Sequence, residues 1–427
     1  VGSEMCIRDS PSYGRGGITP RPQKHRNMPE ISLRAEQMPA SPIRKLVPLA
    51  DAARARGTKI YHLNIGQPDL PSPKEGLESL KHIDRKVLEY SPSDGYRSLR
   101  EKLVEYYAQY QIRLTADDII VTTGGSEAVL FAFMSCLNPG DEIIVPEPAY
   151  ANYMAFAVSA GAVIRPITAS IEDGFALPSV EKFEELINDR TRGILICNPN
   201  NPTGSVYPRE VLEGIVEIAR RHQLMIFADE IYDRLCMDGY EHVSIASLAP
   251  DLPCVTFSGL SKSHMIAGYR IGWMVLSGNQ RCMSDFIMGI NMLSNMRLCS
   301  NVPAQSIVQT ALGGHQSVND YIRPGGRVYE QRNFVYEALN KIDGISVVKP
   351  RAAFYIFPKM DVKKFNITDD EQFALDLLHE KKILITRGGG FNWAEPDHFR
   401  IVYLPRMEVL KESLEDLADF FDHYRQA

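Results

Sequence analysis

The sequence predicts an α/β fold: a large domain with a mainly parallel sheet between helices, followed by a smaller α+β domain. From about residue 115 onward, short apolar runs alternate with longer amphipathic segments, the element order of a parallel sheet covered by helices. Several runs are almost continuously hydrophobic, as expected of strands buried on both faces. The chain has 427 residues, 44% of them hydrophobic, which is enough for two cores.

The strands expected in the sheet are short runs rich in Val, Ile, Leu and Phe. They are 118–123, 141–150, 193–199, 224–232, 254–259 and 270–276. Helical periodicity indicates intervening helices such as 126–137 and 209–222. The apolar stretch 154–164 is too short to span a membrane, and we interpret it as a core helix.

The pattern changes after about residue 310. A long helical stretch, 303–343, precedes a predicted strand pair within 344–360. A further strand at 398–404 and a closing helix at 408–426 complete a second, α+β domain. We therefore expect a large domain at 76–310 and a small one at 311–427, with residues 28–75 joining the small domain.

The N-terminal segment 1–27 is compositionally odd. It begins "VGSEMCIRDS", which resembles a translated sequencing adapter, and continues with a Gly/Pro/Arg-rich stretch. It lacks the apolar central region of a signal peptide. We expect a non-native or disordered leader with the true start at Met28; a genuine leader is the alternative.

Composition narrows the class of protein. A formal net charge of -6 without basic clusters argues against nucleic acid or an anionic membrane as the main partner. The seven cysteines are irregularly spaced and fit neither a disulfide framework nor a zinc site. We expect a reduced, cytoplasmic protein without a metal.

Ligands of open parallel sheets bind beyond the carboxyl ends of the strands. In this chain those ends carry glycines, polar side chains and cations. They are Gly124-Gly125-Ser126, Tyr150, Asn201 in "NPNNPTG" (198–204), Asp229 and Tyr232 in "ADEIYD", and Lys262 and Arg270 in "GLSKSHMIAGYR".

Taken singly, each feature has a structural explanation: a turn with Ser126 as the helix cap, a core tyrosine, a rigid loop, a structural salt bridge at Asp229, or a surface turn with two cations. Together they match what pyridoxal phosphate requires. A lysine bonds to its aldehyde, a carboxylate keeps its ring nitrogen protonated, and an arginine with backbone N–H groups holds its phosphate.

These motifs, in this order and spacing, resemble the class I/II aminotransferases of pyridoxal phosphate fold type I, from Met28 to the end of the chain. The resemblance implies a seven-stranded sheet. It also implies that Lys262 bonds the cofactor, that Asp229 pairs with the ring nitrogen, and that Tyr232 and Asn201 bind the ring's 3-oxygen.

Further positions match the family's ligand contacts. The resemblance assigns Arg270, Ser261, Gly125 and Ser126 to the phosphate, Tyr150 to ring stacking, and Arg400 and Gly66 to the substrate α-carboxylate. Tyr90 matches a tyrosine that crosses a dimer interface to the partner's cofactor phosphate. The resemblance therefore implies a homodimer with shared active sites.

Some positions depart from aspartate aminotransferases, which carry serine where this chain has Gly259 and Gly124, and tryptophan where it has Tyr150. Residues 259–314 are most similar to bacterial alanine (glutamate–pyruvate) aminotransferases. Arg297 lies one residue away from an arginine that binds a distal carboxylate, so it is a candidate for the γ-carboxylate of glutamate.

We therefore expect transamination between an amino acid, with alanine favoured, and a 2-oxo acid such as 2-oxoglutarate or pyruvate, by a ping-pong mechanism. Lys262 would be the general base and acid, assisted by Asp229 and Tyr232. Alternatives are an aspartate, aromatic or branched-chain aminotransferase, a carbon–sulfur lyase of the same fold, or a cofactor-sensing transcription regulator. The last would need a DNA-binding extension, for which 1–27 is too short.

Overall fold

The computed structural model describes residues 30–42, 45–84 and 86–427. The expected leader and Met28 lie outside the described residues. Contacts divide the chain into two units, one ending at Gln37 and the other spanning 38–427. The first contains helix α1 (Leu33–Gln37), and the second contains the other described elements. Among the described residues, no helix combines the length and apolar character needed to cross a membrane.

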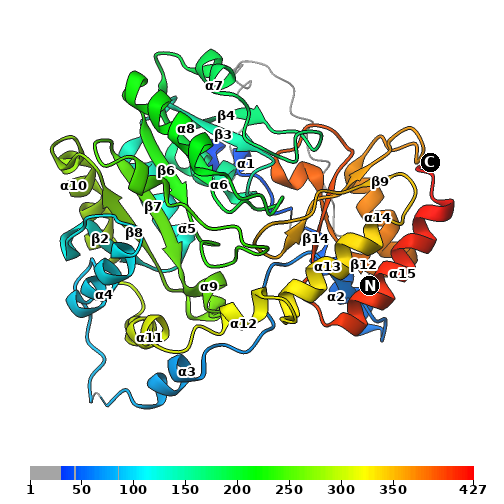
Figure 1. Ribbon diagram of the computed structural model, residues 1–427, viewed down its shortest axis with the longest axis horizontal. Helices are drawn as coiled ribbons and strands as arrows, with labels where there is room; N and C mark the ends of the chain where they lie inside the picture. Colours follow the sequence, from blue (N-terminus) through cyan, green and yellow to red (C-terminus); the bar gives the residue numbers. More distant parts are fainter. Residues whose placement is uncertain (1–29, 43–44, 85) are drawn as a thin grey trace. The chain divides into compact units, whose positions relative to one another are not determined.

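A seven-stranded sheet lies among helices in one part of 38–427, and the C-terminal elements lie beside it (Figure 1). Its order is β2-β8-β7-β6-β5-β3-β4, and β8 runs antiparallel to all the other strands. The strands are β2 (Ile119–Thr122), β3 (Glu142–Glu147), β4 (Val163–Thr168), β5 (Thr191–Cys197), β6 (Met225–Asp229), β7 (Cys254–Gly259) and β8 (Gly272–Ser277). The predicted α/β fold with a mainly parallel seven-stranded sheet is confirmed.

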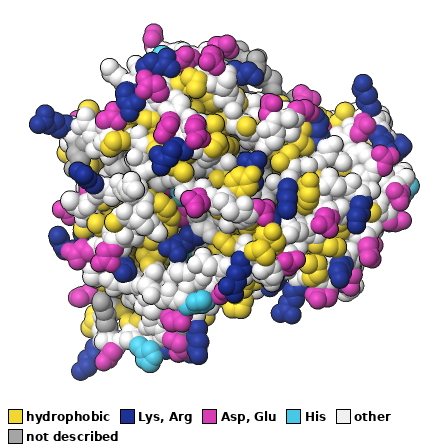
Figure 2. Space-filling model, in the orientation of Figure 1, with side chains coloured by type: hydrophobic (Ala, Val, Ile, Leu, Met, Phe, Trp, Pro, Cys, Tyr) yellow, Lys and Arg dark blue, Asp and Glu magenta, His cyan; other side chains and the backbone are white. Residues whose placement is uncertain are grey.

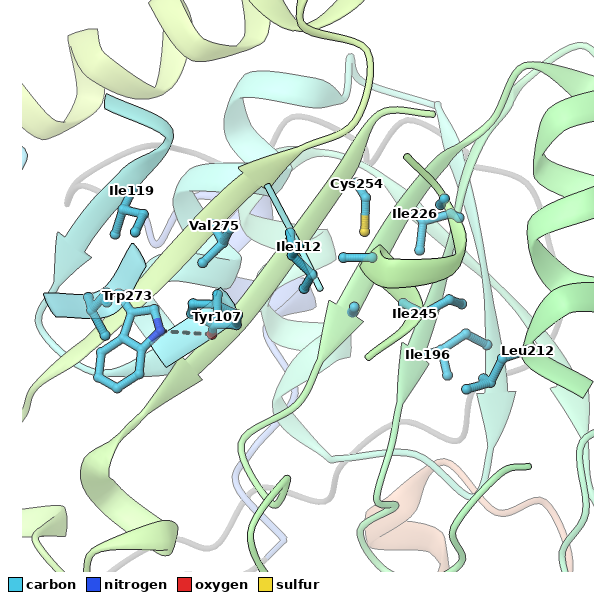
Figure 3. Packing of buried hydrophobic residues seen from close by; sticks show 14 of the residues in the cluster. Tyr107, Ile112, Ile119, Ile196, Leu212, Ile226, Ile245, Cys254, Trp273 and Val275 are labelled. Carbon is cyan, nitrogen blue, oxygen red and sulfur yellow. Dashed lines mark hydrogen bonds between the residues drawn. The ribbon is translucent and has the colours of Figure 1, made fainter. Parts of the chain in front are cut away.

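Helices cover both faces of this sheet because successive strand residues point to opposite sides. Ile119 and Val121 pack with α4 (Arg97–Ala108), α8 (Arg209–His222) and α11 (Val302–Gly313). Ile120 packs on the other face with α5 (Gly125–Cys136), α6 (Asn152–Ala160) and α10 (Gln280–Arg297). On the first face, the buried Trp273 indole donates a hydrogen bond to the Tyr107 hydroxyl at 2.9 Å (Figure 3).

The stretch 154–164 is not one core helix. Helix α6 ends at Ala160, where Gly161 adopts a left-handed conformation with φ +78°, and β4 begins at Val163. Strand β4 lies at the edge of the sheet and only its Ile167 is buried. An edge strand of this kind lacks the continuous apolar run by which the other strands are recognised.

The C-terminal elements build a second core. Helices α13 (Arg327–Leu339), α14 (Asp370–Lys381) and α15 (Met407–His423) contribute to it. They pack with a three-stranded sheet of β10 (Tyr355–Ile356), β14 (Phe399–Val402) and β13 (Thr386–Arg387). A further pair joins β9 (Ile345–Ser346) and β11 (Lys359–Met360). The predicted helical stretch 303–343 is divided into α11, α12 (Val318–Ile322) and α13.

Strand β1 (Tyr61–His62) pairs in parallel with β12 (Ile383–Leu384), which brings residues near 61 to the C-terminal elements. The domain boundaries themselves stay a prediction. The remaining α-helices are short: α2 (Val47–Ala55), α3 (Lys74–Lys81), α7 (Val180–Leu186) and α9 (Leu260–Ser263). On the face drawn in Figure 2, acidic and basic side chains are interspersed rather than separated by sign.

Candidate active site

A cavity of about 510 Å³ lies where β6 and β7 end. The structure places most of the predicted site residues in its lining, and their catalytic or binding roles stay predictions. These lining residues are Gly66, Gly125, Ser126, Tyr150, Asn201, Asp229, Tyr232, Ser261, Lys262, Arg270 and Arg400.

Asp229 is the last residue of β6 and is buried. The Tyr153 hydroxyl donates to its Oδ2 at 2.5 Å, and the Ile231 N–H donates to its Oδ1 at 3.3 Å. Burial raises the pKa of this carboxyl. The structural salt bridge considered from sequence is not found among the described residues, so a cationic ligand atom would gain a partner here.

A tight backbone approach at one end of the cavity has the groups that suit an anion. Gly124 has φ +82°, and a Cβ there would lie 2.3 Å from Arg270 Nη2. A Cβ on Gly272 would lie 2.6 Å from the Gly124 carbonyl carbon. These glycines let the Arg270 guanidinium approach the first turn of α5, whose N-cap is Gly124 rather than Ser126. The N–H groups in the first turn of α5 and the Arg270 guanidinium therefore lie close together at this end of the cavity.

Gly259 has a steric explanation. A Cβ on this residue would lie 2.8 Å from the Ile271 carbonyl oxygen and 3.0 Å from Gly272 Cα. The close pairing of β7 with β8 therefore leaves no room for the serine of aspartate aminotransferases. The hydroxyl groups of Ser126 and Ser261 remain in the lining.

Lys262 follows β7 in the short helix α9, and its Nζ donates a hydrogen bond to the Gly66 carbonyl oxygen. Gly66 in turn packs against Tyr355, because a Cβ at Gly66 would lie 2.0 Å from Tyr355 Oη. The backbone of 66 therefore reaches the lysine only because it carries no side chain.

Arg400 lies on β14 and is 1% exposed. Its Nη1 donates to Asn201 Oδ1 at 2.9 Å and its Nη2 to the Asn64 carbonyl oxygen at 2.5 Å, while its buried Nε has no hydrogen-bond partner among the residues that the structure describes. The Tyr355 and Phe391 ring centroids lie 4.3 and 4.7 Å from its Cζ. Burial lowers the pKa of this guanidinium, so a carboxylate entering the cavity would be strongly stabilised.

Tyr90 and Arg297 do not line the cavity. Tyr90 is 75% exposed. Arg297 forms an ion pair with Glu127 at 2.5 Å and donates to the Ser93 carbonyl oxygen at 2.8 Å. Within its own chain Arg297 therefore fastens the segment around Ser93 to α5 instead of facing substrate. A role of either residue across a dimer interface stays a prediction.

Three further residues of the cavity lining were not predicted from the sequence. Tyr153 binds Asp229, Tyr355 lies beside Arg400, and Asn152 Nδ2 donates to the Tyr150 hydroxyl at 2.9 Å. Both tyrosines occur in apolar runs that are typical of core segments. Only the tertiary contacts reveal them.

The family model of aminotransferase class I and II matches residues 58–417. The chain belongs to this family. It is 47% identical to the glutamate–pyruvate aminotransferase AlaA of Escherichia coli strain K12 over 87% of this chain and 92% of that protein. It is 43% identical to an alanine aminotransferase of Mycobacterium bovis, over 87% and 88% of the two chains. The crystal structure of an Escherichia coli aminotransferase superposes with a TM-score of 0.91 at 44% identity, covering 94% of this chain and all of that one.

Class I/II aminotransferases of this fold use pyridoxal phosphate, and the cavity of this aminotransferase fits that group. The carboxyl of Asp229 is buried without a cationic partner among the described residues, which suits a protonated ring nitrogen. The glycine-lined approach of Arg270 to α5 suits a phosphate. Lys262 lies in the same lining. The chain is a pyridoxal phosphate-dependent aminotransferase, which moves an amino group from an amino acid to a 2-oxo acid.

Proposed function

We propose that this aminotransferase exchanges the amino group between alanine and 2-oxoglutarate, with pyruvate and glutamate as the other pair, by a ping-pong mechanism. The observation that carries the choice of alanine is the similarity to two relatives whose names give alanine or pyruvate, at 47% and 43% identity. Of the described lining residues, only Lys262, Arg270 and Arg400 are cationic. If these serve the cofactor bond, the phosphate and the α-carboxylate, they suffice for alanine, because a methyl side chain needs no cation. The second carboxylate of 2-oxoglutarate would then need a cation from outside this lining.

Each residue receives a proposed role from its position. Arg400 binds the substrate α-carboxylate through the donors that Asn201 and Asn64 leave free. Because Asn201 Oδ1 accepts from Arg400, the amide Nδ2 of Asn201 is available to donate to the ring's 3-oxygen. Tyr232 is the second donor to that oxygen, and the Asp229 carboxylate holds the positive charge of the ring nitrogen.

Lys262 carries the proton transfers. With pyridoxal phosphate bound, the Lys262 Nζ would hold it, and as a free amine it would move a proton between the substrate Cα and the cofactor carbon that carries the amino group, in opposite directions in the two half-reactions. When bound, pyridoxal phosphate supplies the electron-withdrawing ring that stabilises negative charge at Cα. Tyr150 covers one face of the ring, and Ser261 and Arg270 hold the phosphate with the backbone of Gly125 and Ser126.

We further propose a homodimer that shares its active sites. Three exposed methionines, Met288, Met292 and Met296, form a stripe along α10 with exposed fractions of 54, 61 and 72%. Tyr90 is exposed and lies shortly before Ser93 in the sequence. The Ser294 hydroxyl of α10 donates a hydrogen bond to the Ser93 carbonyl oxygen at 2.6 Å. A second copy of the chain would cover this apolar surface and place Tyr90 beside the partner's phosphate site. Arg297 stays a candidate for a distal carboxylate across that interface.

Two further expectations stand as proposals. The large domain spans 76–310 and the small one 311–427 together with 28–75, which the pairing of β1 with β12 supports. The protein works in the cytoplasm, where the buried thiols of Cys197 and Cys254 would stay reduced.

A panel of substrates tests the proposed reaction. The purified protein, loaded with pyridoxal phosphate, is assayed with alanine, glutamate, aspartate, tyrosine and leucine against pyruvate, 2-oxoglutarate and oxaloacetate. We expect the highest kcat/KM for alanine with 2-oxoglutarate. A higher value for aspartate or an aromatic donor would contradict the choice of alanine. Pyruvate release from cystathionine without amino transfer would indicate a lyase.

A further inference from the structure

Tyr355, on β10, lies where three parts of the proposed active site meet. Its hydroxyl is 2.9 Å from the Tyr232 hydroxyl. Its ring centroid is 4.3 Å from Arg400 Cζ, and its side chain fills the space that a Cβ on Gly66 would occupy. It is 2% exposed and lines the cavity.

The direction of the bond between the two hydroxyls follows from counting protons. A phenol has one proton to donate and lone pairs that accept. If Tyr232 donates its proton to the 3-oxygen of the cofactor, as its proposed role requires, its bond with Tyr355 must be donated by Tyr355. Among the described residues, Tyr355 is the one side chain that hydrogen-bonds the Tyr232 hydroxyl.

We propose that Tyr355 is a positioning residue whose hydroxyl donates to Tyr232 Oη, and thereby directs the Tyr232 proton towards the 3-oxygen of the cofactor. The proposal rests on the proposed function and deepens it. A hydroxyl that accepts one hydrogen bond is polarised and donates its own proton more strongly. The bond from Tyr355 would therefore strengthen the bond from Tyr232 to the 3-oxygen.

Arg400 supports this role of Tyr355. Its guanidinium carbon lies over the Tyr355 ring, and the Phe391 ring lies 4.7 Å from the same carbon. A cation over a phenol ring draws electron density from it and makes the hydroxyl a stronger donor. The residue that would bind the substrate carboxylate is thus linked, through Tyr355 and Tyr232, to the cofactor oxygen.

Titration of the bound cofactor tests the proposal. The visible absorbance of the loaded enzyme is followed from acid to alkaline pH for the wild type and for Tyr355→Phe, Tyr232→Phe and the double variant. Each Phe keeps its ring and removes one hydroxyl. The proton that titrates would lie on the lysine–cofactor nitrogen and would donate to the 3-oxygen of the cofactor. A hydrogen bond from Tyr232 to the same oxygen competes with this donation and therefore lowers the pH midpoint of the titration.

We expect Tyr232→Phe to raise the pH midpoint of the titration. Tyr355→Phe should raise it less, by an amount that corresponds to a proton affinity about 3- to 10-fold higher than in the wild type. The double variant should match Tyr232→Phe alone, because Tyr355 acts through Tyr232. A midpoint unchanged in Tyr355→Phe, or additive shifts in the double variant, would overturn the proposal. A mere packing role would lower the melting temperature of Tyr355→Phe and leave the midpoint in place.

Failure of the proposed function would look different. It would show in the wild type, as a loaded protein without a titrating absorbance or without amino transfer in the substrate panel. If the wild type titrates and transfers, and Tyr232→Phe shifts the midpoint while Tyr355→Phe does not, the role of Tyr355 alone is refuted.

Discussion

Lys262 is oriented by a neighbour from a distant part of the chain, the carbonyl oxygen of Gly66. We predict that Lys262→Ala abolishes amino transfer, a loss of at least about 10⁴-fold, because both the cofactor bond and the proton carrier disappear. Steady-state assays with alanine and 2-oxoglutarate measure this loss. The matched control is Lys363→Ala, at an exposed lysine, which should retain full activity. Wild-type turnover in Lys262→Ala would refute the assignment of the active site.

Gly66 is expected to tolerate no side chain. In Gly66→Ala the new Cβ would lie 2.0 Å from Tyr355 Oη, so the backbone that holds Lys262 or the tyrosine must shift. We predict a loss of kcat/KM of about 100-fold, typical of a small misplacement of a reacting group. Gly313→Ala is the control, since a Cβ there would meet no atom of the described residues beyond its own helix within 4 Å. Equal activity of the two variants would show that the contact is not needed.

The sequence predicted the residues that follow strands, and missed those that reach the site from within apolar segments. Lys262 and Asp229 are polar groups at the ends of buried runs, where a structural reason for them is hard to find. Tyr153 and Tyr355 lie among hydrophobic neighbours, and a tyrosine there is typical of a core. Their partners, Asp229 and Arg400, are distant in sequence, so no local pattern encodes the contact.

At the scale of elements, the pairing of β7 with β8 sets what the phosphate end of the cavity can contain. Introducing the serine of aspartate aminotransferases, Gly259→Ser, would press a Cβ to 2.8 Å from the Ile271 carbonyl oxygen. We predict a loss of stability of about 1–3 kcal/mol, as for other overpacked sites. Urea unfolding measures it, with Gly313→Ser as the control. Unchanged stability together with tighter cofactor binding would contradict the steric explanation.

Glu147, the last residue of β3, makes the stability depend on pH. Its carboxyl accepts a hydrogen bond from Asn392, and burial raises its pKa from 4.5 to about 7. Between these values the unfolded chain binds fewer protons than the folded one, so stability falls as pH rises from about 4.5 to 7 and stays lower above that.

We predict that Glu147→Gln removes this loss. The stability of the variant relative to the wild type should be greater at pH 8 than at pH 5, by up to roughly 3 kcal/mol. Urea unfolding at the two pH values measures the difference, and Glu213→Gln, at an exposed glutamate of α8, should show none. A relative stability of Glu147→Gln that is the same at both pH values would refute the role of burial.

The helices and strands that were predicted from the sequence are those that are well buried. Strands β5 to β8 and helix α8 follow their apolar patterns closely, because both faces or one stripe must be covered. Strand β4 was missed because it is an edge strand with Pro166 in its middle and Ile167 as its one buried residue. Gly161, which separates it from α6, is the signal that would have divided the two.

For the whole molecule, the methionine stripe on α10 predicts how two chains associate. Met292→Asp would place a charge at the centre of an apolar interface, and we expect it to shift the protein from dimer to monomer. Sedimentation velocity measures the mass. Val163→Asp, at an edge strand residue that is 46% exposed, is the control and should stay dimeric. A monomeric wild type, or a dimeric Met292→Asp, would contradict the proposed interface.

The ion pair between Arg297 and Glu127 has a consequence for the working enzyme. Glu127 is the third residue of α5, and its carboxylate also accepts the Thr123 N–H at 2.8 Å, beside the proposed phosphate site. Arg297 holds the chain leading to Tyr90 at the same time. In the proposed dimer, the bonds of Arg297 would therefore stabilise both the interface and the phosphate site. Binding of the partner chain and binding of the cofactor would then each strengthen the other. Dilution would release the cofactor along with the partner, and added pyridoxal phosphate would restore both.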